Sequence, residues 1–154
     1  MINSSLCYIE KDGCYLMLHR IKKNVDINKN KWIGVGGRFI EGESSLECCN
    51  REIKEETGLD VQKLHFRGII TFFSNNTVTE HMHLFTCDSF SGELIECDEG
   101  VLEWIPKDKI FDLSLWEGDK IFLKLLFDNE PFFLLKLNYE NDKLVSYDLN
   151  IDVF

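Results

Sequence analysis

The sequence has no apolar run close to the roughly 18 residues that a membrane-spanning helix requires. Its first residues, MINSSLCYIEKDG, also lack the basic start and apolar stretch of a secretory signal. We found no internal repeat and no low-complexity linker. These absences predict a cytoplasmic protein with no membrane partner, and 154 residues fit a single domain spanning 1–154.

Basic residues are scarce relative to acidic ones, since 17 Lys and Arg stand against 27 Asp and Glu, for a net charge of −10. Binding to a nucleic acid polymer requires a basic face, so no such partner is expected. A small phosphorylated substrate remains compatible with this charge if divalent metal ions supply the positive charge. Such ions require clustered carboxylates.

Paired cysteine spacing of the metal-binding kind is also missing, although the chain contains 6 cysteines. Most lie in apolar stretches, where a thiol behaves as a small hydrophobic group, so we expect reduced cysteines. His81 and His83 share one face of an expected strand, but no third ligand is placed to complete a transition-metal site. Local hydrogen bonding is the expected role of these two imidazoles.

Apolar and turn residues alternate in an order that predicts more strands than helices. Segment 21–31 is expected to be a solvated polar loop, and the glycines of 32–39 to form a turn or a close backbone approach. A second helix is expected over 119–127. The expected strands are 6–9, 14–18, 64–73, 81–87, 100–105, 132–139 and 144–151.

The first expected helix covers 44–57. Ser44 and Glu47 have the spacing of a capping box, and Gly58 is a typical helix end. Leu46, Cys49 and Ile53 recur at spacings of three and four residues, so they can form one buried stripe. This stripe would dock the helix on a sheet.

Three glutamates of this helix, Glu52, Glu55 and Glu56, are expected within an arc of about 100° on its surface. Glutamate-rich helices are usually only solvated surfaces. Like charges at this spacing repel one another, however, and a hard cation such as Mg²⁺ or Mn²⁺ would remove that repulsion. Arg51 can anchor one of the glutamates through a bidentate ion pair.

A longer pattern decides between a solvated glutamate surface and a metal site. Gly37, Glu43 and the segment REIKEETGL that begins at Arg51 together resemble the Nudix box at every defining position. This resemblance implies an α+β Nudix fold, an α/β/α sandwich around a mixed sheet with a catalytic loop, helix and loop. It implies an Mg²⁺ or Mn²⁺ site and a hydrolase active site. The implied ligands are the Gly37 carbonyl, Glu52, Glu55, Glu56 and Glu99, with Glu43 and Arg51 in support and Glu56 favoured as the general base.

Outside the box, the sequence is similar to MutT-like enzymes that hydrolyse oxidised purine nucleoside triphosphates. By this resemblance, Trp116 and Asp119 in WEGD lie against the base, Phe72 lines the base pocket, and Arg20 and Arg38 contact the substrate. Core packing and ordinary surface charge are the alternatives for these side chains. Two positions depart from the pattern, because Ile33 replaces an amide side chain and Gly118 replaces an acidic residue.

The function expected from this resemblance is hydrolysis of a purine nucleoside triphosphate such as 8-oxo-dGTP to a monophosphate and pyrophosphate. One alternative is hydrolysis of another nucleoside diphosphate derivative, such as a nucleotide sugar, a dinucleotide or a capped RNA end. A Nudix module that binds a nucleotide without turnover is another. Both a monomer and a homodimer are compatible with the sequence.

Overall fold

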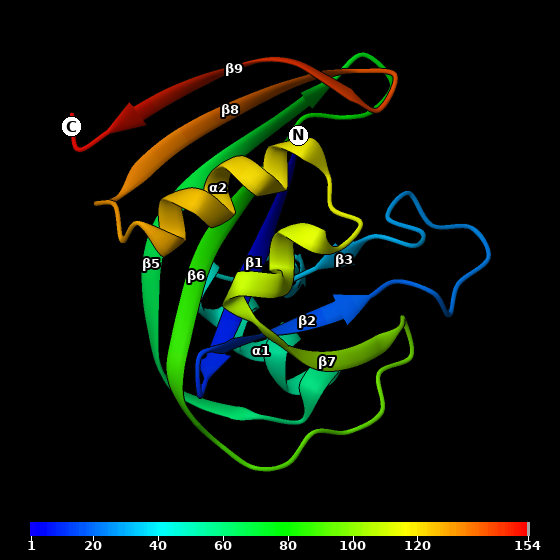
Figure 1. Cartoon of the computed structure of the whole chain (residues 1–154), viewed down its shortest axis with the longest axis vertical. Coiled ribbons are helices and arrows are strands. Elements are labelled where there is room, and N and C mark those ends of the chain that lie inside the picture. The colour runs from blue at the N-terminus through cyan, green and yellow to red at the C-terminus, as the bar shows by residue number, and fades with distance from the viewer. Residues whose placement is uncertain (154) are drawn as a thin grey trace.

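The computed structural model describes residues 1–153, and its centre is a mixed sheet with helices on both faces (Figure 1). The helices are α1 (Ser45–Thr57), α2 (Glu117–Phe127) and the short 3₁₀ helix η1 (Lys107–Asp112). The strands are β1 (Ile2–Lys11), β2 (Cys14–His19), β3 (Trp32–Ile33), β4 (Val35–Arg38), β5 (Asp60–Ser74), β6 (Glu80–Ser91), β7 (Val101–Pro106), β8 (Phe133–Glu140) and β9 (Lys143–Ile151). No helix of this part of the chain is long and apolar enough to cross a membrane.

The strands are ordered β3-β2-β1-β6-β5-β8-β9, with β4 paired to β1 and β7 paired to β2. Two neighbouring pairs, β1 with β6 and β5 with β8, are parallel, and the remaining pairs are antiparallel. Parallel neighbours need long crossover connections, and the crossover from β5 to β8 contains α2. This mixed sheet between helices confirms the expected α+β class.

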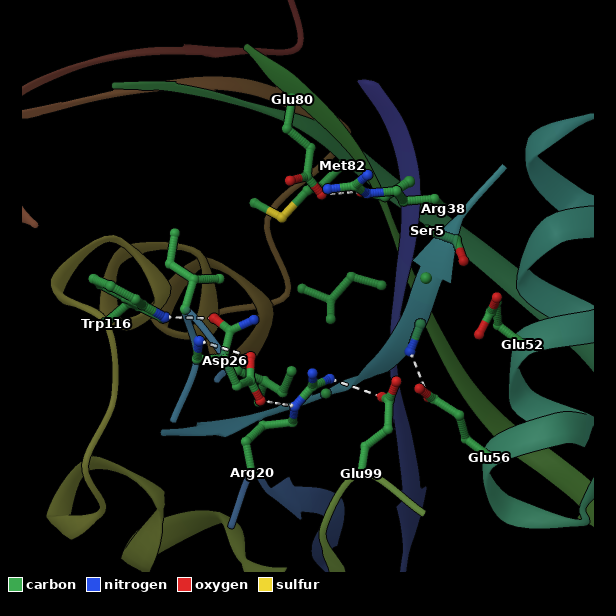
Figure 2. A pocket seen from close by; sticks show the side chains of 18 of the residues that line it. Ser5, Arg20, Asp26, Arg38, Glu52, Glu56, Glu80, Met82, Glu99 and Trp116 are labelled. Atoms are coloured by element: carbon green, nitrogen blue, oxygen red, sulfur yellow. Dashed lines mark hydrogen bonds and ion pairs between the residues drawn. The ribbon is translucent and has the colours of Figure 1, made fainter. Parts of the chain in front are cut away.

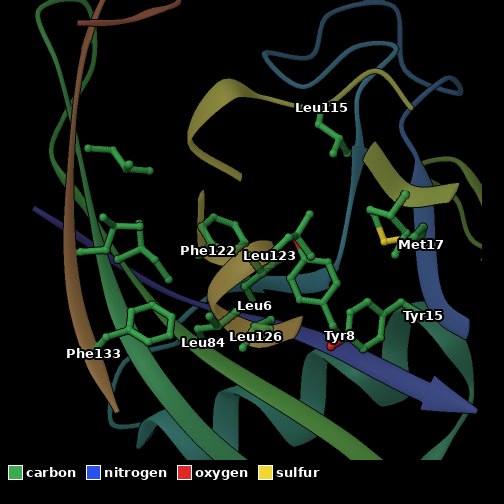
Figure 3. Close-up of a cluster of buried hydrophobic side chains, with 14 of the residues drawn as sticks. Leu6, Tyr8, Tyr15, Met17, Leu84, Leu115, Phe122, Leu123, Leu126 and Phe133 are labelled. Carbon is green, nitrogen blue, oxygen red and sulfur yellow. The ribbon is translucent and has the colours of Figure 1, made fainter. Parts of the chain in front are cut away.

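Strand β1 contributes to both hydrophobic cores because successive side chains point to opposite faces of a sheet. Leu6 and Tyr8 belong to the core that lies under α2 (Figure 3). Cys7 and Ile9 belong to a second core, which contains Cys49 and Ile53 of α1. The two helices therefore cover opposite faces of one central strand.

The expected first and last hairpins are present as β1–β2 and β8–β9, and both expected helices are present. Of the turn or close backbone approach expected for residues 32–39, the close approach is present, within the short strands β3 and β4. Gly36 explains why, since a Cβ at this position would overlap the carbonyl oxygen of Ser5 on β1. The glycine allows close strand pairing. The helix η1 had no counterpart among the expected elements.

Candidate active site

One pocket of about 620 Å³ lies between α1, the sheet and the start of α2 (Figure 2). Strands β1, β4, β5 and β6 contribute its wall on the sheet side, and the segment 23–28 closes another side. Its lining includes most of the residues expected at the site: Arg20, Gly37, Arg38, Glu52, Phe72, Glu56, Glu99, Trp116 and Asp119. Residues from distant parts of the sequence therefore share one cavity.

The start of α1 is fixed by the capping box that the sequence predicts. The Ser44 hydroxyl accepts a hydrogen bond from the Glu47 backbone N–H at 3.2 Å, and the Glu47 carboxylate accepts one from the Ser44 N–H at 3.0 Å. At the other end, Gly58 adopts a left-handed conformation with φ of 79°. These two ends set which side chains of α1 face the sheet.

Arg51 joins α1 to the loop that precedes it. Its guanidinium donates to both carboxylate oxygens of Glu43, at 2.6 and 2.9 Å, and to the Arg38 carbonyl at 3.0 Å. Hydrogen bonds from Arg51, and one from the Ile40 N–H, lower the pKa of Glu43 to about 2. Glu43 and Arg51 thus support the loop and helix as predicted, and neither lines the pocket.

Glu52 lies directly against the Cα of Gly37. A Cβ at Gly37 would overlap the Glu52 carboxylate, so only glycine fits at this position without displacing the acid. The carboxylate accepts a hydrogen bond from Arg51 at 2.7 Å, and its pKa is raised, chiefly because the group is partly buried. The Gly37 carbonyl faces the Cys48 thiol at 3.4 Å.

Glu56 and Glu99 point toward each other in the pocket (Figure 2). Glu56 is 8% exposed and accepts a hydrogen bond from the Gly36 N–H at 3.0 Å. Burial and, after it, the neighbouring Glu99 raise the pKa of Glu56. Arg20 donates to Glu99 at 2.8 Å. Two acidic groups this close require a shared proton or a cation between them, and carboxylate oxygens are the ligands that Mg²⁺ and Mn²⁺ prefer.

Glu55 is not part of this group. Its side chain is 59% exposed, pairs with Arg51 at 3.2 Å and does not line the pocket. The expectation that all three glutamates of α1 project together is therefore met by Glu52 and Glu56 alone, because Glu55 is turned toward solvent. Within residues 1–153, no three His, Cys, Asp or Glu side chains converge tightly enough to hold an ion as they stand.

At the far end of the pocket, Trp116 and Asp119 flank the start of α2. The Trp116 indole N–H donates to Asn28 at 2.8 Å, and the Lys31 ammonium lies 5.1 Å from its ring centroid. Asp119 is 8% exposed, and burial raises its pKa to about 7. Phe72 lines the pocket and also packs against Tyr139.

Gly118, one of the two departures from the MutT-like pattern, has a physical explanation. Its N–H donates to the Tyr139 hydroxyl at 2.7 Å, and a Cβ at Gly118 would lie 2.9 Å from that oxygen. Leu137 and Tyr139 therefore take the space that a side chain at Gly118 would need. Ile33, the other departure, lines the pocket with an apolar side chain.

The polar segment 21–31 is more than the solvated loop expected from sequence, since Lys23, Asp26 and Asn28 line the pocket. Asp26 pairs with Arg20 at 2.8 Å and accepts a hydrogen bond from the Asn28 N–H at 3.0 Å. Such a loop has no hydrophobic periodicity. Its acidic and amide residues were therefore the only sequence feature that indicated specific contacts.

Glu80 and Met82 of β6 also line the pocket and were not anticipated. Alternation along β6 places them on one face, but the sequence does not show which face that is. On the same strand, His81 contacts the Thr71 hydroxyl at 3.1 Å and His83 contacts Asn3 at 3.5 Å. The local hydrogen bonding expected for the histidines is thus present.

A family comparison agrees with this geometry, since the model of the NUDIX domain matches residues 4–126. The chain belongs to the Nudix family and is a Nudix hydrolase.

Its relatives are of the MutT type. The chain is 33% identical over 121 residues to an oxidized purine nucleoside triphosphate hydrolase of Danio rerio, covering 78% of each chain. It is 32% identical over 126 residues to the protein of that name in Mus musculus, covering 80% of this chain and 81% of the relative. The crystal structure of a MutT protein from Bacillus halodurans superposes with a TM-score of 0.86 at 27% identity, covering 97% of this chain and 98% of that one.

Proposed function

We propose that this chain hydrolyses purine nucleoside triphosphates, oxidised ones such as 8-oxo-dGTP included, to a nucleoside monophosphate and pyrophosphate. The observation that carries the proposal is the single pocket that joins the carboxylates of Glu52, Glu56 and Glu99 to Trp116 and Asp119. Its volume of about 620 Å³ lies within the usual range for a small-molecule site. The oxidized purine nucleoside triphosphate hydrolases among its relatives support the same substrate class.

Glu52, Glu56 and Glu99 are the side chains that would hold Mg²⁺ or Mn²⁺, with the Gly37 carbonyl as a further oxygen ligand. A bound divalent cation neutralises phosphate charge during cleavage. The donor set fits, because the carboxyl groups of Glu56 and Glu99 already face each other at low exposure. Glu55 pairs with Arg51 instead, so metal binding by Glu55 would require this ion pair to open.

The remaining side chains have separate tasks in this mechanism. Glu56 takes the proton of the attacking water, whose oxygen bonds to phosphorus as the anhydride bond between the α and β phosphates breaks. A divalent cation bound beside Glu56 would keep its carboxylate ionised and so able to accept this proton. Within residues 1–153 the Arg38 guanidinium has no ion-pair partner, so it is available to the phosphates, while Arg20 positions Glu99.

Base binding is assigned to the other end of the pocket. Trp116 lines the pocket and offers its indole ring to the purine, and the Lys31 ammonium lies 5.1 Å from the centroid of that ring. Stacking of a base on an aromatic ring contributes about 1 to 3 kcal/mol. Asp119 offers a buried carboxyl group to the edge of the base, and Phe72 completes the apolar wall.

A substrate panel tests the proposal. The purified chain is incubated with Mg²⁺ and, in turn, 8-oxo-dGTP, dGTP, ATP, a nucleotide sugar, a dinucleoside polyphosphate and a capped RNA fragment, and products are identified by mass. We expect monophosphate and pyrophosphate from a purine triphosphate. Turnover of only the other compounds would support the alternative hydrolase, and binding without turnover of any compound would support a nucleotide-binding module.

We propose further that one catalytic domain spans 1–154 and that no nucleic acid polymer is a partner. The pocket of one chain contains the proposed general base, Glu52, Glu99 and the side chains proposed to bind the base, so the chemistry requires neither a second copy nor a dimer interface.

A further inference from the structure

The side-chain amide of Asn28 has one end fixed and one end free. Its oxygen lies 2.8 Å from the Trp116 indole nitrogen. An indole N–H can only donate, so the amide oxygen must face Trp116 and the NH₂ group must point elsewhere. The orientation of this amide is therefore set by chemistry.

The free end of this amide is accessible from the pocket. Within residues 1–153 the Asn28 NH₂ group has no hydrogen-bond partner, and it is not among the buried polar atoms that lack one. Since Asn28 lines the pocket, its two N–H donors are available to a bound molecule.

The backbone around Asn28 holds it in place. Its N–H donates to Asp26 at 3.0 Å, and its carbonyl accepts from the Lys31 N–H at 2.8 Å. Asp26 is in turn paired with Arg20 at 2.8 Å (Figure 2). Because the backbone and Trp116 already hold the Asn28 side chain, it loses little conformational freedom when its NH₂ group binds a ligand.

Nearby, the apolar Ile33 offers no hydrogen bond to a base. We infer that Asn28 is a specificity-determining residue, whose NH₂ group donates to the carbonyl oxygen of a 6-oxo purine and disfavours a 6-amino purine. A 6-oxo purine presents an acceptor beside an N–H donor, and Asp119, when ionised, supplies the acceptor for that donor. This inference rests on the proposed triphosphate hydrolysis.

The test is a substitution that replaces the NH₂ donor of Asn28 by an acceptor and keeps the oxygen that accepts from Trp116. In Asn28→Asp, one carboxylate oxygen still accepts from Trp116, while the other now faces the base as an acceptor. The ratio of kcat/KM for dGTP to kcat/KM for dATP is measured in both proteins. We expect the ratio to fall by about 10-fold to 100-fold, the usual discrimination of one well-placed base contact.

Asn24→Asp is the matched control, because it adds the same charge to the same segment at an exposed residue outside the pocket. Its ratio should equal that of the wild type. An unchanged ratio in Asn28→Asp, or an equal change in both variants, would overturn the inference. Absence of triphosphate hydrolysis in the wild type would instead refute the proposed function.

A second measurement needs no variant and guards against misfolding of Asn28→Asp. The wild type is assayed with 2-aminopurine riboside triphosphate, which is guanosine triphosphate without the 6-oxo group. We expect kcat/KM about tenfold or more below that for GTP, because loss of the oxo group removes the acceptor for the NH₂ group of Asn28 together with the ring N–H donor for Asp119. Equal values for the two nucleotides would overturn the assignment of Asn28.

Discussion

Glu55 and Glu56 are adjacent in sequence but have different surroundings. Glu56 is 8% exposed inside the pocket, whereas the Glu55 side chain is 59% exposed and pairs with Arg51. We expect Glu56→Gln to reduce kcat by roughly 100-fold to 10,000-fold, because a general base contributes about this much. Glu55→Gln should cost far less. Steady-state rates with saturating Mg²⁺ measure both effects.

Circular dichroism provides the control for this pair, since both variants should keep the helical signal of the wild type. Equal losses of activity in the two variants would show that Glu55 also acts at the reacting phosphate. Full activity of Glu56→Gln would show that Glu56 is not the general base.

Asp119 makes the stability of the folded protein depend on pH. Its pKa is raised from 3.8 to about 7 by burial, so the folded state favours the protonated form. Stability from this group is complete below pH 4 and is lost as pH rises through 7. Asp119→Asn should not lose this stability. As pH rises from 5 to 8, its free energy of unfolding should therefore increase by roughly 2 to 3 kcal/mol relative to that of the wild type.

Urea unfolding at the two pH values measures this difference. Phe72→Leu is a suitable control, because it changes the same pocket without changing a titrating group. A difference between wild type and Asp119→Asn that stays constant from pH 5 to pH 8 would contradict the raised pKa.

At the residue scale, sequence was informative where a charge has a fixed chemical partner. Arg51 was expected to pair with a glutamate of the helix, and it does so with Glu52 and Glu55, although its bidentate partner is Glu43. Asn28 could not be found in this way, because its role depends on an indole N–H that lies 88 positions away in sequence. Such a pairing exists only after the sheet has brought the two segments together.

Among the elements, the contact between β4 and α1 controls the geometry of the site. Gly37→Ala would push a methyl group into the Glu52 carboxylate. We expect turnover to fall by about 10-fold to 100-fold, as for other changes that displace a metal ligand, and the Mg²⁺ concentration for half-maximal activity to rise. Activity measured across a Mg²⁺ titration shows both.

Ser44→Ala is the informative comparison for this element. It removes the cap of α1 and should lower the free energy of unfolding by about 1 kcal/mol. Its Mg²⁺ dependence should match the wild type, since Ser44 does not line the pocket. If Gly37→Ala showed the same pattern as Ser44→Ala, the glycine would serve stability alone.

The elements themselves were predicted unevenly. Capping residues and the apolar stripe of α1 act locally, so the helix was predicted within one residue of its observed start at Ser45. Strands β3 and β4 were missed, because a two-residue strand and a glycine-rich strand lack the periodicity that marks longer ones. Only pairing with β1 and β2 defines them.

The whole molecule carries a net charge of −10, and several of its acids converge on one pocket. Ligands that bind only the folded state stabilise it by mass action. We therefore expect Mg²⁺ to raise Tm, with a stabilisation of about 2 to 3 kcal/mol at 100 times Kd. Differential scanning fluorimetry across a Mg²⁺ titration measures this shift.

NaCl at matched ionic strength controls for general screening of the acidic surface. Glu99→Gln should weaken the Mg²⁺ response while leaving the response to NaCl intact. A rise in Tm that is equal for both salts would exclude a specific cation site in the pocket.

The position of β1 at the centre of the sheet also bears on biosynthesis. Residues 2–9 lie parallel to residues 80–87, so β1 gains this neighbour long after it is translated itself. The helix α2, which covers the Leu6 and Tyr8 side of β1, is translated later still. Non-local pairing of this kind slows folding and exposes intermediates to aggregation. Nascent chains that end before β6 should therefore depend on chaperones, and those that extend beyond α2 should not.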